Sequence, residues 1–133
     1  MQLKELSGDL VFTASVPPTA AGTAIELPVL SLPFALTITE AKWIPGAAIT
    51  ANGTNFFTLT IRNRQSGAGV VAPATRSYAS GNSVATTPEN LTLSGTATDL
   101  QAAANDVLTA HFTHSGSGLA IPAGLVQVKV RLR

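Results

Sequence analysis

The chain has 133 residues, which suits one domain with a single hydrophobic core. It has no cysteine, and this excludes a disulfide framework and a thiolate metal site. Charged residues make up 11% of it, against about 25% in ordinary soluble domains, and the net charge is only +1. So few charges predict a subunit that packs against copies of itself or a larger assembly, although a stable β-domain of no special association is the alternative.

No targeting or membrane segment is expected. Residues 2–9 mix basic and acidic side chains and lack the pattern of a signal peptide. The most apolar window, residues 20–36, is broken by Glu26, Pro28 and Pro33, whereas a membrane helix needs about 20 predominantly apolar residues. The prediction is a soluble protein without an export signal of its own.

Residues 1–8 are predicted to form a short N-terminal arm, followed by a single β-sandwich domain over residues 9–133. Residues 2–6 show no clean alternation, and Gly8 marks the end of the arm. In residues 10–16 every second side chain is apolar, which is the period of a strand with one buried face. Two prolines then end this strand, because proline cannot donate to a ladder.

Two later segments depart from simple alternation. Residues 25–29 read as a strand in which Pro28 removes a ladder donor, so we expect an edge strand or an irregular one. In residues 34–44 the apolar parity reverses near Glu40, and such a phase reversal predicts a β-bulge or a bend into a second sheet.

The middle of the chain predicts further short strands over residues 55–64, 70–78 and 89–94. Ser-Gly pairs recur between the strands as turn signals. Residues 98–105 are ambiguous: the spacing of Thr98 and Gln101 matches a capping box, so one helical turn is an option there.

The last quarter of the chain is the most regular. Residues 106–114 and 125–133 both alternate with period two, and we expect them to form a hairpin joined by residues 115–124. Its inner face is predicted to be core, and the residues concerned are Leu108, Phe112, Val126, Val128 and Val130.

The fold expected from these patterns is all-β. We count seven to nine short strands, no substantial helix, and loops rich in glycine, proline and serine. This combination favours an antiparallel two-sheet sandwich, jelly-roll-like, over any fold with a parallel sheet.

No catalytic constellation stands out. His111 and His114 are the only histidines, and on a strand they point to opposite faces, so they cannot chelate one metal as a regular pair. A Ser–His–Asp arrangement could be drawn from Ser115, His111 and Asp106, but strand parity separates Asp106 from His111. Glu40 has no second acid on its face to make the pair that glycoside cleavage needs. We therefore expect no enzyme, no metal and no cofactor.

Two surface features have ordinary explanations. Five basic residues could form an anion-binding face, namely Arg62, Arg64, Lys129, Arg131 and Arg133. Eight basic residues against seven acidic ones make a poor footprint for nucleic acid, so we expect solvated or subunit-facing strand residues instead. Trp43, the single tryptophan, is expected in the core or an interface.

Three runs of sequence resemble the small β-rich auxiliary capsid proteins, of the decoration or cement type, on tailed-bacteriophage heads. The runs are residues 28–39, 45–64 and 105–128, and the resemblance spans roughly residues 20–133. It implies a structural virion protein that binds the capsid exterior as a homo-oligomer, commonly a trimer. Such a protein holds neighbouring major capsid subunits together; it would be made in the host cytoplasm, with no nucleic acid and no membrane as partner.

The capsid contact is predicted in the N-terminal arm, at Gln2, Leu3, Lys4, Glu5 and Leu6. Adding a strand to a neighbour's sheet is one way in which the arm would make this contact. The main alternative function is a carbohydrate- or receptor-binding β-sandwich module of a phage fibre or a bacterial surface. That module would need an exposed aromatic platform, and the chain has one tryptophan and one tyrosine. A small hydrolase with an unrecognised site is a third, weaker alternative.

Overall fold

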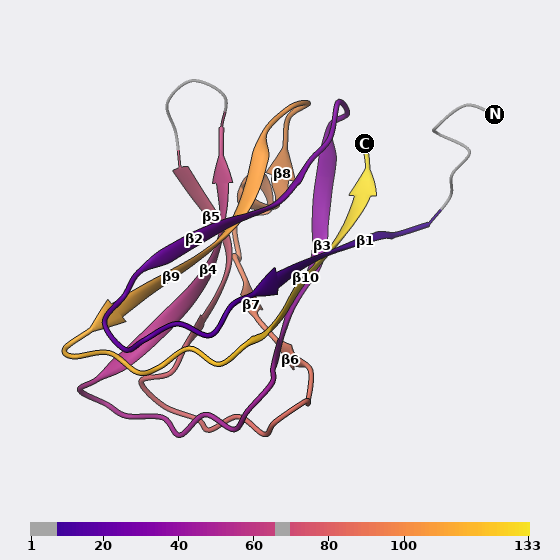
Figure 1. Ribbon diagram of the computed structural model, residues 1–133. Coiled ribbons are helices and arrows are strands. Elements are labelled where there is room, and N and C mark those ends of the chain that lie inside the picture. The colour runs from indigo at the N-terminus through magenta and orange to yellow at the C-terminus, as the bar shows by residue number, and fades with distance from the viewer. Residues whose placement is uncertain (1–7, 66–69) are drawn as a thin grey trace.

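The computed structural model describes residues 8–65 and 70–133, which contain ten strands and one short 3-10 helix (Figure 1). The strands are β1 (Leu10–Val16), β2 (Ile25–Ser31), β3 (Leu36–Pro45), β4 (Phe56–Arg64), β5 (Val70–Ser77), β6 (Glu89–Asn90), β7 (Thr92–Leu93), β8 (Gln101–Ala102), β9 (Val107–Ser115) and β10 (Gly124–Leu132). The helix, η2, covers Ala97–Leu100.

The strands form two antiparallel sheets that pack face to face. One sheet has the order β1-β10-β3-β6, with β8 paired to the end of β3, and the other has the order β2-β9-β4-β5-β7. Apart from β4 and β5, which are neighbours in one sheet, successive strands alternate between the sheets, so β1, β3, β6 and β10 face β2, β4, β5 and β9. This connectivity is that of a jelly roll and confirms the predicted fold class. The count of seven to nine strands becomes ten, because β6, β7 and β8 are only two residues long.

The predicted hairpin of the last quarter is wrong. β9 and β10 lie in different sheets, where β9 pairs with β2 and β4, and β10 pairs with β1 and β3. Their connection crosses from one sheet to the other and is longer than the two to five residues of an ordinary hairpin loop. Alternation identifies a buried face but not the pairing partner. The predicted inner face is confirmed, since Leu108, Phe112, Val126, Val128 and Val130 are all fully buried.

The irregularities expected from the sequence are present. β2 is an edge strand of its sheet, and its register against β9 shifts between Pro28 and Leu30. β3 carries the predicted bulge: Lys129 pairs with Glu40 while Val130 pairs with Ile38, so Thr39 is the extra residue. The bulge lets both halves of β3 bury their apolar residues on the same side.

The ambiguous segment near residue 98 resolves into the four-residue helix η2. Thr96 occupies the N-cap position and no side chain caps the helix, so the expected capping box does not form. Just before it, β6 belongs to one sheet and β7 to the other, and Leu91 between them is buried. A segment that crosses between the sheets is too distorted to continue as one strand.

Candidate functional site

The candidate functional site is one end of the sandwich, where four loops meet. The loops are residues 17–24, 46–55, 79–88 and 116–123, and the jelly-roll order brings them to the lower left of Figure 1. Each follows a strand of one sheet and leads into a strand of the other. We call this surface the loop end.

Backbone hydrogen bonds tie the four loops into one surface. Thr19 and Ile121 exchange two N–H···O bonds, both with an N···O distance of 2.9 Å. Ile49 and Ser83 form a similar bridge, with N···O distances of 3.1 and 2.9 Å. The Gly46 N–H donates to the Ala123 carbonyl at 2.6 Å, which joins the two bridged pairs.

Asparagine side chains, which carry no charge, hydrogen-bond to backbone N–H groups within and between the loops. The Asn52 carbonyl Oδ1 accepts the N–H groups of Thr54 and Asn55, at 2.9 and 2.8 Å. The Asn55 Oδ1 accepts the Ser117 N–H at 2.8 Å, and the Asn82 Oδ1 accepts the Ala51 N–H at 2.9 Å. These bonds order the loops in advance, so a partner would lose less conformational entropy on binding them.

The four loops of the loop end contribute no ionisable side chain of their own. None of its four loops contains aspartate, glutamate, lysine, arginine or histidine. They consist of alanine, threonine, serine, glycine, proline and asparagine with a few aliphatic residues. The Arg76 guanidinium of β5 reaches one of these loops, where it donates to the Ser80 and Gly81 carbonyls at 3.1 and 2.8 Å. Burying the loops themselves against another protein adds no unpaired charge, which would be costly.

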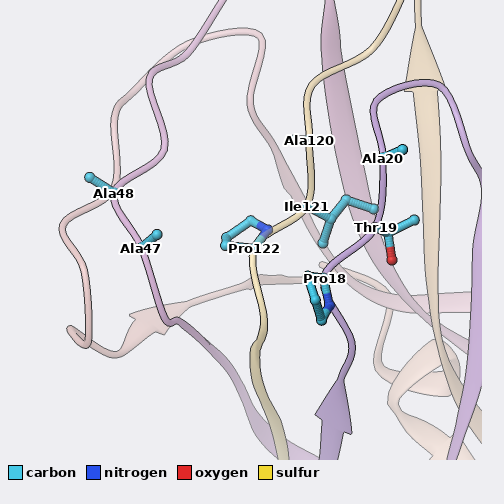
Figure 2. Close-up of a pocket in the computed structure, with 8 residues that line it drawn as sticks. All are labelled: Pro18, Thr19, Ala20, Ala47, Ala48, Ala120, Ile121 and Pro122. Atoms are coloured by element: carbon cyan, nitrogen blue, oxygen red, sulfur yellow. The ribbon is translucent and has the colours of Figure 1, made fainter.

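A shallow apolar groove of about 440 Å³ lies on the loop end (Figure 2). Its lining residues are Pro18, Thr19, Ala20, Ala47, Ala48, Ala120, Ile121 and Pro122. Figure 2 shows the Ala47 side chain pointing toward Pro122 across the groove, while the side chain of the next residue, Ala48, points away from it. Val84 is 67% exposed on the neighbouring loop. The groove lacks the convergent polar groups that orient a small-molecule ligand, so its chemistry fits apolar side chains of a protein partner.

The basic residues considered for an anion-binding face are dispersed and paired. Arg62 and Arg64 lie on the β4 sheet, each within 3.7 Å of the Glu26 carboxylate. Lys129 and Arg131 lie on the other sheet and pair with Glu40 at 3.7 Å and Asp9 at 3.0 Å. The fifth residue, Arg133, reaches the Gln101 side chain at 3.3 Å. Among the residues that the structure describes, acidic partners on two separate faces leave these five side chains without the basic patch that phosphate binding requires.

The residues of the sketched catalytic triad do not meet. Asp106 and Ser115 lie at opposite ends of β9, which at about 3.3 Å per residue separates them by roughly 30 Å. The Asp106 carboxylate accepts hydrogen bonds from the Asn63 side chain at 3.2 Å and from the Ala103 N–H at 2.9 Å. These hydrogen bonds indicate that Asp106 has a structural role.

The two histidines serve different parts of the fold. His114 donates from Nε2 to the Thr23 carbonyl at 2.8 Å, which ties β9 to the first loop of the loop end. His111 accepts a hydrogen bond at Nδ1 from the Arg62 guanidinium, at 2.9 Å. Burial, and then the nearby Arg62 charge, lower the pKa of His111.

Glu26 supplies the negative charge that pairs with Arg62 and Arg64 on the outer face of the sheet that contains β4. Its carboxylate accepts the Thr109 hydroxyl at 2.7 Å, and this hydrogen bond, with help from Arg62 and Arg64, lowers the pKa of Glu26 despite partial burial. The cluster is an ion-paired network across β2, β4 and β9. No group of three or more histidine, aspartate or glutamate side chains able to hold a metal occurs among residues 8–65 and 70–133.

Three further expectations from the sequence concern the capsid contact, an aromatic platform and a membrane helix. Gln2, Leu3, Lys4, Glu5 and Leu6, the predicted capsid contact, lie outside the described residues. Trp43 and Tyr78, the only tryptophan and tyrosine, are fully buried, so neither offers the aromatic platform of a sugar-binding face. In the described part of the chain, no helix is long and apolar enough to cross a membrane.

The loop end itself was missed from the sequence. The sequence does contain a sign of it, because four separate runs lack any charged residue. These runs are residues 17–24, 46–55, 79–88 and 116–123. Nothing in the sequence says that these runs share one surface, because that depends on which strands pair.

No family model matches the chain, and no curated protein matches it. Among solved structures, a chain in the structure of the infectious bursal disease virus Gx strain is similar to it, with a TM-score of 0.44 and 11% sequence identity. The match covers 92% of this chain and 32% of that one, so this chain spans about a third of the length of the viral chain. The jelly-roll assignment rests on the strand order described above and not on this likeness.

Proposed function

We propose that this protein is a structural virion subunit, which binds the outside of a tailed-phage head as a homo-oligomer and holds neighbouring major capsid subunits together. The resemblance over residues 20–133 suggests the phage head and a trimer. The observation that carries a structural role is the loop end, an ordered surface built from uncharged loops with an apolar groove. Such a surface suits burial against protein.

The residues in and around the groove favour the binding of a protein partner over a catalytic role. Ala47 and Ala48 present small side chains that allow close approach, and Val84 projects an apolar side chain beside them. Interfaces lose charged residues at their cores, and the loop end has this composition throughout. We assign the loop end to the contact with the capsid.

Charged variants of the loop end test this assignment. We expect Ala48→Glu and Val84→Glu to reduce occupancy on undecorated heads by at least about tenfold, because each would bury an unpaired carboxylate. The matched control is Thr113→Glu, an exposed position on the face of β9, which should bind as the wild type does. Co-sedimentation with purified heads measures occupancy, and full occupancy by both loop-end variants would refute the assignment.

The N-terminal arm is a separate proposed contact. Deleting residues 1–7 should weaken capsid binding and leave the soluble oligomer unchanged. The deletion changes no residue of the four loops, so its effect is scored separately from that of the loop-end variants. Capsid occupancy that is unchanged by the deletion would remove the arm from the proposal.

A further inference from the structure

Of the two long strands that end the sheets in the described chain, β1 and β2, only β1 is left open to pairing. Natural proteins blunt the edges of sheets with prolines, bulges, charges or very short strands. β2 carries Pro28, a register shift and Glu26. At the other side of the sandwich the edge strands β6, β7 and β8 are two residues long, and the parts of β3 and β5 that they leave uncovered carry charges or a proline, namely Glu40, Pro73 and Arg76.

β1 has none of these devices. All seven residues of Leu10–Val16 pair with β10 without a register shift, and the strand contains no proline, glycine or charged residue. About half of its backbone N–H and C=O groups point away from β10. No hydrogen bond joins these groups to any other described part of the chain.

A half-exposed apolar strip runs beside this edge, on the open side between the two sheets. Its residues pack only partly against the core, and they are Leu10, Phe12, Ile25, Leu27 and Val29. Val11 is 54% exposed on the outer face of β1. A partner strand on the β1 edge would pair with the outward N–H and C=O groups of β1 and would also cover part of the apolar strip.

From the edge and the strip we infer that β1 pairs with β1 of a second copy, antiparallel, across a twofold axis at Thr13. This register uses the whole strand. It places Leu10 opposite Val16, and it leaves no charged residue opposite another.

The side chains match in this register. Phe12 falls opposite Ala14, and Val11 falls opposite Ser15, so a larger side chain meets a smaller one in both pairs. Thr13 meets its own copy on the axis, exposed on the outer face. A self-complementary edge of this kind is what an isologous interface requires.

The inference concerns the free protein and does not depend on capsid binding. The β1 edge is distinct from the loop end, so a threefold contact elsewhere can coexist with it. The copy number is therefore even: a dimer if β1 is the only contact, or a hexamer if it joins two trimers.

Charge pairs on the axis test the contact. Thr13→Lys and Thr13→Glu each place like charges opposite each other, so each variant should have half the mass of the wild type in light scattering coupled to gel filtration. An equimolar mixture of the two should recover the wild-type mass, since lysine then faces glutamate. Thr113→Lys and Thr113→Glu are the matched controls and should keep the wild-type mass, separately and mixed.

A wild-type copy number that is odd would overturn the inference, and so would a Thr13 variant of unchanged mass or a mixture that stays at half mass. Hydrogen exchange of the wild type provides a test that needs no variant. The outward amides of residues 10–16 should be protected at high protein concentration and lose protection on dilution; rapid exchange at both concentrations would equally overturn it.

Discussion

Trp43 on β3 and Phe112 on β9 meet edge to face across the two sheets, with ring centroids 5.7 Å apart and an interplanar angle of 70°. Both side chains are fully buried. The geometry brings the positive edge of one ring to the negative face of the other, which adds to the stabilisation from burial alone. This contact, with the Phe57 ring tilted against Phe112 at a centroid distance of 5.8 Å, fixes the middle of the core.

Loss of the Phe112 ring should destabilise the protein strongly. Phe112→Ala should lower the free energy of unfolding by about 3–5 kcal/mol, because it removes a buried ring and leaves a cavity between the sheets. Thr113→Ala, the exposed neighbour on β9, should change it by about 0.5 kcal/mol or less. Urea denaturation of both variants measures the difference, and similar losses in the two would contradict the packing described here.

Tyr78 should titrate late. Burial, and then its hydrogen bond to Glu89, raise the pKa of Tyr78 to about 12, with a Ser83 bond opposing the shift. Its hydroxyl donates to the Glu89 carboxylate at 2.9 Å. Because it is the only tyrosine, absorbance of tyrosinate near 295 nm reports on it alone. A transition near pH 10 in the folded protein would contradict this environment.

The same shift makes stability depend on alkaline pH. Since the folded-state pKa lies above the unfolded value of about 10, the contribution of Tyr78 is complete below pH 10 and is lost as pH rises towards 12. The loss approaches about 2–3 kcal/mol, at about 1.4 kcal/mol for each tenfold change in proton affinity. Tyr78→Phe should lack this component, so the difference between the two unfolding curves against pH isolates it.

His111 should respond in opposite directions to its two neighbours. Burial lowers the pKa of His111 first, the Arg62 charge lowers it further, and the Glu26 charge raises it. Arg62→Gln should therefore raise the pKa of His111, and Glu26→Gln should lower it. Proton NMR titration measures the pKa of His111 in a His114→Gln background, where it is the only imidazole. Changes of the same sign in the two variants would contradict the arrangement of Arg62 and Glu26 around His111.

Gly124 should not accept a side chain. A Cβ there would lie 2.7 Å from the ring of Trp43 and would also collide with the Ile44 carbonyl. Gly124→Ala should cost about 1–3 kcal/mol of unfolding free energy through overpacking. Gly95→Ala is the matched control, because a Cβ at that position meets nothing within 4 Å. Thermal unfolding compares the two, and equal stability would contradict the close approach of β10 to Trp43.

Local patterns were sufficient for much of the fold. The period-two alternation of β1 and β4 placed their strands, and the phase reversal near Glu40 located the bulge of β3. Pro28 marked β2 as an edge strand. These features depend on residues adjacent in the chain, since a buried face, a missing N–H and an extra residue each leave their mark within one strand.

The sequence by itself therefore determined the β-rich class, the buried faces and the shortage of charge. Only the tertiary structure decided which strands pair, and so it separated β9 from β10 and gathered four uncharged loops at one end. The same pairing left β1 as the open edge. The physical reason is that strand pairing joins segments distant in sequence through backbone hydrogen bonds, which every residue except proline can offer and which therefore leave little trace in the side chains.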